Sequence, residues 1–180
     1  MHIRKADGRI LLGVALFIIL CGCSRNRAET PYGDAESLMA YRAAVDPIIS
    51  EINEVEESLR TMAVGSTGRA TGENLAVACQ VLDGRLATVL SQIDAVDPPR
   101  KLRAMHADMR TAVDLRMRAC QRIAVGWQIE REASFEAAQS TYLEAEALLS
   151  EARARLVAVN AVLNEVDVAL DSAGFQSPMA

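Results

Sequence analysis

Apolar residues recur in steps of three and four along most of the chain, which is the spacing of one face of an α-helix. The first series predicts a helix from Ala35 to about Val64, capped by Asp34, with apolar positions at Leu38, Tyr41, Val45, Ile48, Ile52, Val55, Leu59 and Met62. Pro47 interrupts this helix, and the pair Asp46-Pro47 is also a favourable helix start. Because the apolar steps keep their phase across Pro47, we expect one kinked helix, and the alternative is a short helix followed by a second one.

A second helix is predicted after the glycine-rich segment 65–72, whose composition is typical of a loop. It extends from about Glu73 to Val96, and its apolar face consists of Leu75, Cys79, Leu82, Leu86, Val89, Ile93 and Val96. Gly84 lies inside this helix, where a glycine costs about 1 kcal/mol relative to alanine. We therefore expect a neighbouring helix to approach closely at Gly84.

Two further helices are predicted after the stop signal Asp97-Pro98-Pro99. The third has apolar positions at Leu102, Met105, Met109, Val113, Cys120, Ile123 and Trp127. Gly126 is expected to weaken the end of this helix, which leaves open whether a loop or a continuous kinked rod joins it to the next. The fourth extends from about Ser134 to Leu170, with apolar positions at Phe135, Ala138, Tyr142, Ala145, Leu149, Ala152, Leu156, Val159, Leu163, Val166 and Leu170.

Four long amphipathic helices with short connections predict an all-α fold, an antiparallel up-down four-helix bundle. The bundle domain is expected to cover residues 34–172, with a flexible tail at 173–180. No segment shows the alternating pattern of a β-strand. The domain is long enough to bury a core without metal ions or multiple disulfides.

The N-terminal segment has the pattern of a secretion signal. Arg4, Lys5 and Arg9 precede an uncharged apolar run at 10–20, which is shorter than the roughly 20 residues of a transmembrane helix. The run ends in Leu20-Cys21-Gly22-Cys23, which resembles the lipobox of bacterial lipoproteins. The alternatives are an ordinary cleaved signal peptide and an uncleaved anchor.

The resemblance implies cleavage after Gly22 and lipidation of Cys23 with fatty acyl chains, which would anchor the protein in a membrane. Residues 1–22 are then the signal peptide and residues 23–33 a polar tether. The expected location is the cell envelope, facing the periplasm or the exterior. Ser24 after the lipidated cysteine favours the outer membrane if the host has one, by the sorting habit of proteobacterial lipoproteins.

The charge balance argues against a nucleic-acid partner. The chain has a net charge of −5, and the predicted leader holds three basic residues and one acid, so the remainder is more acidic still. Binding to nucleic acid needs a basic face that neutralises phosphates. The same acidity disfavours charge-driven adhesion to anionic lipid.

Two cysteines of the predicted bundle are placed to form a disulfide. Cys79 precedes Pro99 by 20 residues and Cys120 follows it by 21, so an antiparallel hairpin that turns at Pro99 puts them at nearly equal height. Both lie on the apolar face, and their small neighbours Ala78 and Ala119 permit close approach. The alternatives are two buried thiols that act as small apolar residues, and redox or metal chemistry. No Cys-x-x-Cys motif follows the predicted leader.

Other candidate ligands favour structural roles. His106 is the only histidine after the predicted leader and cannot build a zinc site, so we expect it at the surface or at the boundary of the core, beside the Pro-Pro turn. Non-covalent haem, held by His106 and a methionine, is an alternative. A stripe of methionines favours core packing over a soft-metal site, and it consists of Met105, Met109 and Met117. A cluster of acids favours a solvated face over a cation site, and it consists of Glu51, Glu54, Glu56 and Glu57.

No catalytic motif is recognisable. The loop at 65–72 lacks the Lys-Ser/Thr ending of a phosphate-binding loop, and nothing around His106 resembles a nucleophile elbow. We therefore expect a non-enzymatic protein without catalytic residues, cofactor or metal.

The leading hypothesis is an envelope lipoprotein whose bundle binds an unknown envelope protein or acts as a spacer, with homo-oligomer contacts possible along the long seams. Four apolar residues are candidates for an exposed contact, or for burial in a wide bundle stripe: Trp127, Leu148, Val157 and Val162. The alternative function is a ligand-binding bundle that holds a small apolar molecule or haem between its helices. A periplasmic sensor module is disfavoured because no second membrane segment follows.

Overall fold

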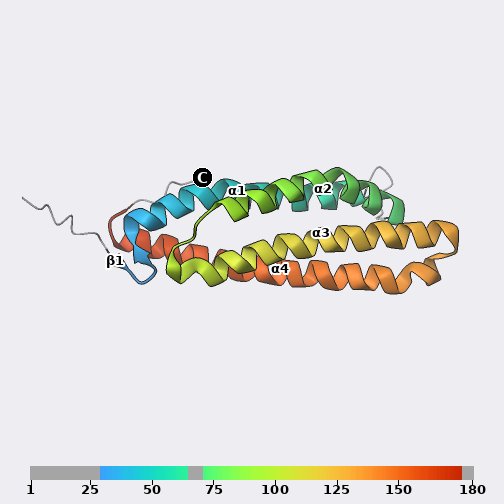
Figure 1. Ribbon diagram of the computed structural model, residues 1–180. Coiled ribbons are helices and arrows are strands. Elements are labelled where there is room, and N and C mark those ends of the chain that lie inside the picture. The colour runs from blue at the N-terminus through green and yellow to red at the C-terminus, as the bar shows by residue number, and fades with distance from the viewer. Residues whose placement is uncertain (1–28, 65–70, 176–180) are drawn as a thin grey trace, which may run out of the picture.

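The structure is a computed structural model that describes residues 29–64 and 71–175 (Figure 1). The predicted signal peptide, Cys23 and the first part of the predicted tether lie outside the described residues. Four helices make up most of the described chain: α1 (Ala35–Val64), α2 (Gly72–Ala95), α3 (Arg103–Glu132) and α4 (Phe135–Ser172). Two short strands, β1 (Glu29–Thr30) and β2 (Gly33–Asp34), precede α1, and a 3-10 turn, η1 (Arg100–Leu102), precedes α3.

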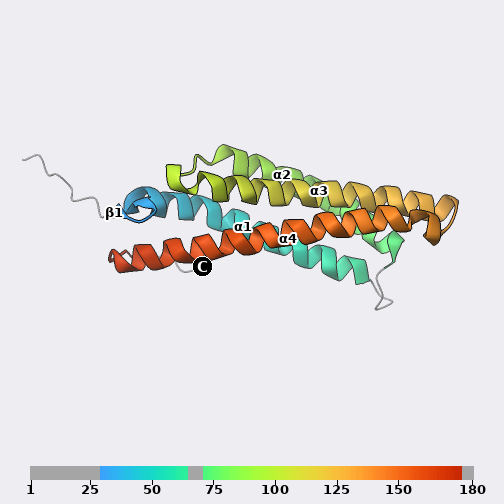
Figure 2. The same cartoon turned by 90° about the horizontal axis from the view of Figure 1, so that it is seen from below.

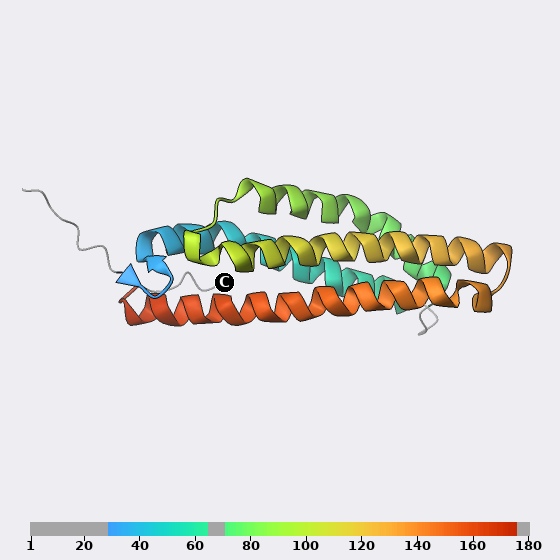
Figure 3. The same cartoon turned by 60° about the horizontal axis from the view of Figure 1, so that its bottom comes forward.

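The predicted all-α helical bundle is confirmed. Each helix runs antiparallel to the one before it, and together they form an elongated body (Figures 1 and 2). The pairing of α3 with α4 is the most extensive, whereas α1 and α4 approach each other closely at few positions (Figure 3). The predicted seams meet in one core, whose fully buried large side chains are Leu38, Val45, Ile52, Leu82, Leu86, Val89, Ile93, Leu102, Met109, Val113, Val159 and Leu170.

The bundle has two ends that differ in structure. The hairpin end carries β1 and β2, and the C-terminal end of α4 lies beside them (Figure 1). The turn end carries the connection from α3 to α4 and the beginning of α2.

Helix α1 passes through Pro47 without a break. The alternative of two separate helices is therefore wrong. Asp34 caps the helix as expected, because its Oδ2 accepts from the backbone N–H of Ser37 at 3.0 Å and from the Ser37 hydroxyl at 2.8 Å. Pro47 lies on the exposed face, where water can solvate the carbonyl of Ala43, which receives no hydrogen bond from the proline nitrogen.

The remaining helix starts follow from local capping chemistry. The Thr71 hydroxyl caps α2 by accepting a hydrogen bond from the backbone N–H of Asn74 at 3.1 Å. The Ser134 hydroxyl caps α4 by accepting one from the backbone N–H of Ala137 at 3.3 Å. Helices α3 and α4 are thus separated by the short turn at 133–134, and the alternative of a continuous rod is wrong.

Two expectations about glycines are wrong. Gly84 is exposed, and a Cβ built on it would meet no atom within 4 Å, so no helix approaches it closely. Gly126 does not weaken the end of α3, which continues to Glu132. Gly126 is buried, and a Cβ there would lie 2.8 Å from the ring of Tyr142 on α4. The close helix contact therefore occurs at Gly126 instead of Gly84.

The sequence Thr30-Pro31-Tyr32-Gly33 forms a tight hairpin, which the apolar pattern of the sequence does not indicate. Proline at the second position and glycine at the fourth are typical of such a turn. The Thr30 hydroxyl donates to the carbonyl of Gly33 at 2.9 Å, and Gly33 has a φ of 135°, which favours glycine. Residues 29–33, expected in the tether, therefore belong to the folded domain.

The end of α4 is closed by a Schellman motif. The Phe175 N–H donates to the carbonyl of Leu170 at 3.0 Å, the Gly174 N–H donates to that of Asp171 at 3.0 Å, and Gly174 has a φ of 81°. Phe175 packs against the core. Residues 173–175 thus continue the folded domain into the segment expected as a flexible tail, and the rest of that segment lies outside the described residues.

Candidate functional site

The structure brings the two predicted partner cysteines together. Cys79 on α2 and Cys120 on α3 are both buried, and their side chains form a hydrogen bond. Both are free cysteines in the structure, so the disulfide stays a prediction. An open groove of about 380 Å³ between α2 and α3 includes both residues among those that line it, beside Gln80, Asp83 and Gln121. A small oxidant or reductant therefore has a route to the pair.

The cysteine pair disfavours two negative charges. The pKa of Cys79 is raised because its thiol hydrogen-bonds to the sulfur of Cys120 and because it is buried. The nearby carboxylate of Asp83 raises the pKa further. The same contact lowers the pKa of Cys120, so the pair releases a first proton from Cys120 more readily than a second proton from Cys79.

His106 lies in the core instead of at the expected surface or boundary position. Its Nε2 is 3.1 Å from the carbonyl oxygen of Ile93 on α2, and its Nδ1 is 3.0 Å from the hydroxyl of Tyr41 on α1. Because a carbonyl can only accept, Nε2 carries the proton and Nδ1 accepts from Tyr41. The imidazole is neutral in this arrangement, and burial lowers its pKa.

The geometry of His106 does not support the alternative of haem ligation. Both ring nitrogens already have protein partners, so neither is free to bind an iron atom. Two of the methionines considered with it, Met105 and Met109, are buried, and Met117 packs against the core. Among the described residues, no group of three or more His, Cys, Asp and Glu side chains is placed to hold a metal ion.

The acid cluster of α1 pairs with arginines from all four helices. Glu51 and Glu54 both contact Arg85 on α2, and Glu57 contacts Arg60 on its own helix. The fourth acid, Glu56, contacts Arg116 on α3 and lies 3.5 Å from a nitrogen of Arg153 on α4. These carboxylates form ion pairs within and between helices, and the face stays largely solvated as expected, since Glu54 and Glu57 are more than 60% exposed.

The Arg116 side chain is the most deeply buried charge of the described chain. The Arg116 side chain is 6% exposed. Burial lowers its pKa, and the nearby Glu56 carboxylate acts in the opposite direction and raises it. Its Nη1 atom has no hydrogen-bond partner in the described structure. Loss of Glu56 would therefore leave a buried cation without its counter-charge.

The four candidate contact residues divide into two groups. Trp127, Leu148 and Val162 are half-buried, as expected for a wide bundle stripe. Val157 is 65% exposed and stays available for a contact.

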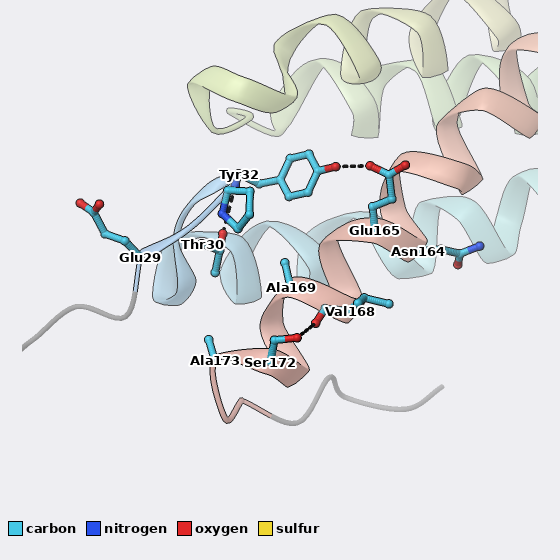
Figure 4. A pocket seen from close by; sticks show the side chains of 10 residues that line it. Glu29, Thr30, Tyr32, Asn164, Glu165, Val168, Ala169, Ser172 and Ala173 are labelled. Atoms are coloured by element: carbon cyan, nitrogen blue, oxygen red, sulfur yellow. Dashed lines mark hydrogen bonds between the residues drawn. The ribbon is translucent and has the colours of Figure 1, made fainter.

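A shallow cavity of about 610 Å³ lies at the hairpin end (Figure 4). Tyr32 and Pro31 form one side, and Glu165, Val168 and Ser172 of α4 form the other. The Tyr32 hydroxyl donates to the Glu165 carboxylate, and this hydrogen bond raises the pKa of Tyr32. The Lys101 ammonium donates to the carbonyl of Pro31 at 2.6 Å. These two contacts fix the hairpin to α4 and to η1.

A second cavity, of about 480 Å³, lies at the turn end between α2, α3 and α4. It is lined by Thr71, Gly72, Leu75, Ile123, Glu130, Phe135, Tyr142, Ala145, Glu146 and Leu149. We call it the turn-end pocket. The sequence pattern placed Phe135 and Tyr142 in the seam of α4 but did not indicate a cavity. The missed signal is Gly126, which leaves room for the Tyr142 ring on the neighbouring helix.

Comparisons with protein-family models, with curated proteins and with solved structures found no match for this chain. Within residues 29–64 and 71–175, no helix is apolar over a stretch sufficient to cross a membrane.

Proposed function

We propose that this protein is a non-enzymatic, membrane-anchored envelope lipoprotein whose bundle acts as a spacer and presents its turn end to a protein partner. The lipobox-like ending at Cys23 supports the anchor. The observation that carries the spacer role is the attachment of the hairpin. Contacts from Tyr32 and Pro31 tie residues 29–34 to one end of an elongated bundle, so the chain that leads back to Cys23 leaves from that end.

The length of the bundle suits this role. Helix α4 contains 38 residues, which corresponds to about 57 Å at the usual rise per residue. A lipid at Cys23 would hold the hairpin end near the membrane, and an upright bundle would carry the turn end outward by roughly that distance. The exposed apolar residues Phe135 and Leu143, near the start of α4, are then available to a partner.

The anchor is tested by mass spectrometry of the N-terminal peptide after expression in a bacterial host. We expect the wild-type peptide to begin at Cys23 and to carry diacylglycerol and an acyl chain. Cys23→Ser should accumulate with its leader attached. Cys21→Ser is the matched control and should be processed like the wild type. Normal cleavage of Cys23→Ser, with release of the protein from the membrane, would instead indicate an ordinary signal peptide.

The spacer role is tested by energy transfer to dansyl-labelled lipid in reconstituted bilayers. Trp127 is the only tryptophan of the chain and lies near the turn end. We expect weak transfer from Trp127 and strong transfer from a variant that combines Trp127→Phe with Val168→Trp, at an exposed position of the hairpin end. Equal transfer from both positions would mean that the bundle lies flat on the membrane and is no spacer.

A further inference from the structure

The turn-end pocket has the size and apolar walls of a small-molecule site. Its volume of about 480 Å³ lies in the usual range for such sites. Three helices contribute aliphatic walls, with Leu75 from α2, Ile123 from α3 and Leu149 from α4. Because the walls come from three packed helices, the pocket is held open by the fold.

Two aromatic rings line the same pocket. Phe135 and Tyr142 stack with their ring centroids 6.1 Å apart and their planes 25° from parallel. Phe135 is 54% exposed, so part of its ring surface is open to a ligand. The Tyr142 ring is held by two glycines, since a Cβ would lie 2.8 Å from the ring at Gly126 and 2.3 Å from the hydroxyl oxygen at Gly72.

The polar lining is acidic. Glu130 and Glu146 are the only charged residues among the described residues that line the pocket. The Tyr142 hydroxyl donates to Glu130 at 2.7 Å, which fixes that carboxylate beside the rings. Burial and the charge of Glu130 both raise the pKa of Tyr142, in agreement with a site that opposes added negative charge.

We propose that the turn-end pocket binds an organic cation with an apolar body. Its ammonium group would lie beside Glu130 and Glu146 and against the faces of Phe135 and Tyr142, as in cation–π recognition of quaternary ammonium groups. Its apolar body would pack against the aliphatic walls. A divalent metal ion is a poorer match, because it prefers six or more oxygen ligands and has no use for aromatic walls. This binding role goes beyond the proposed spacer function and does not depend on it.

The test uses the full chain in a neutral detergent, with benzyltrimethylammonium as the probe. Trp127 reports on binding, because its indole lies 3.1 Å from a Cβ built on Gly72, which lines the pocket. The comparison ligand is neopentylbenzene, in which carbon replaces the charged nitrogen. We expect saturable binding of the cation, at least about tenfold tighter than that of the neutral compound, which corresponds to about 1.4 kcal/mol.

Variants locate the binding. The double change Glu130→Gln and Glu146→Gln removes both charges but keeps an oxygen acceptor for Tyr142. It should lower the affinity for the cation at least about tenfold. Glu132→Gln is the matched control, because Glu132 is exposed at the end of α3 and does not line the pocket. It should change the affinity less than about twofold. Phe135→Ala should weaken binding about threefold or more and leave the helical circular dichroism unchanged.

Three results would overturn the proposal. The first is equal affinity for the cation and the neutral isostere, which would identify an apolar pocket without charge recognition. The second is unchanged affinity in the double glutamine variant. The third is no saturable binding of the cation up to about 10 mM.

Discussion

The Nδ1 atom of His106 on α3 lies 3.0 Å from the hydroxyl of Tyr41 on α1, inside the core. The opposite nitrogen of the same ring is bonded to the carbonyl of Ile93 on α2, so one neutral imidazole links three helices. Burial raises the pKa of Tyr41 to about 12 and lowers the pKa of His106. Both groups are therefore neutral in the folded protein at physiological pH.

We predict that the His106 network makes the protein less stable in mild acid. Asp94 and Asp97 favour the protonated imidazole, but burial outweighs them and keeps the folded pKa below the ordinary value of 6.5. The unfolded chain therefore binds the proton first, and the free energy of unfolding falls as the pH drops below about 6.5, with a slope of up to about 1.4 kcal/mol per pH unit.

The measurement is urea denaturation of the wild type and of His106→Gln between about pH 5 and pH 7.5. The variant should be about 1–3 kcal/mol less stable at the upper pH, because its amide cannot reproduce both hydrogen bonds. It should also lack the part of the pH slope that the histidine contributes. Identical slopes in the two proteins would contradict the prediction.

Because Glu56 pairs with the buried Arg116, we predict that neutralising Glu56 destabilises the protein much more than neutralising its neighbour Glu57. Glu56→Gln should lower the free energy of unfolding by about 2–3 kcal/mol, because Arg116 would stay buried without its counter-charge. This is less than for a fully buried pair, since the Glu56 side chain is 38% exposed. Thermal or urea unfolding measures the change.

Glu57→Gln is the matched control one residue away, where both partners of the ion pair are more than 60% exposed. It should cost less than about 0.5 kcal/mol. Adding Arg116→Met to Glu56→Gln should recover most of the lost stability, because the uncompensated charge is removed. Equal effects of the two glutamine variants would show that Arg116 needs no counter-charge.

We predict that Cys79 and Cys120 form a disulfide when the protein is exported to an oxidising compartment. Tryptic digestion without reductant should give a linked pair of the peptides 70–85 and 119–122, which separates after reduction. Closing this loop should stabilise the oxidised protein by about 4 kcal/mol in the chain-entropy model. The variant Cys79→Ala with Cys120→Ala should show no redox dependence of stability. Complete alkylation of both cysteines without reductant would contradict the disulfide.

The two interior glycines should respond to alanine in opposite directions. Gly84→Ala should stabilise the protein by about 0.5–1 kcal/mol, because alanine favours the helix and its methyl group meets open space at this site. Gly126→Ala should destabilise it by about 1–2 kcal/mol, because the methyl group would displace the Tyr142 ring. Tyr142→Leu should relieve part of that loss. Shifts of the same sign in both alanine variants would contradict the close contact at Gly126.

The pattern of the sequence determined the helices and much of their pairing. Apolar residues at helical spacing and the caps Asp34 and Ser134 are local signals, so α1 and α4 begin close to where they were predicted. The meeting of Cys79 and Cys120 also followed from counting residues around Pro99, because an antiparallel hairpin has a fixed rise per residue.

Tertiary structure decided what depends on the facing surfaces of other helices. Helical periodicity cannot say which glycine a neighbour approaches, so Gly84 and Gly126 were assigned the wrong roles. It also cannot place His106 between Tyr41 and Ile93, because those partners come from separate helices whose rotation is set by packing. The turn-end pocket arises in the same way, from the space that Gly72 and Gly126 leave for a ring on α4.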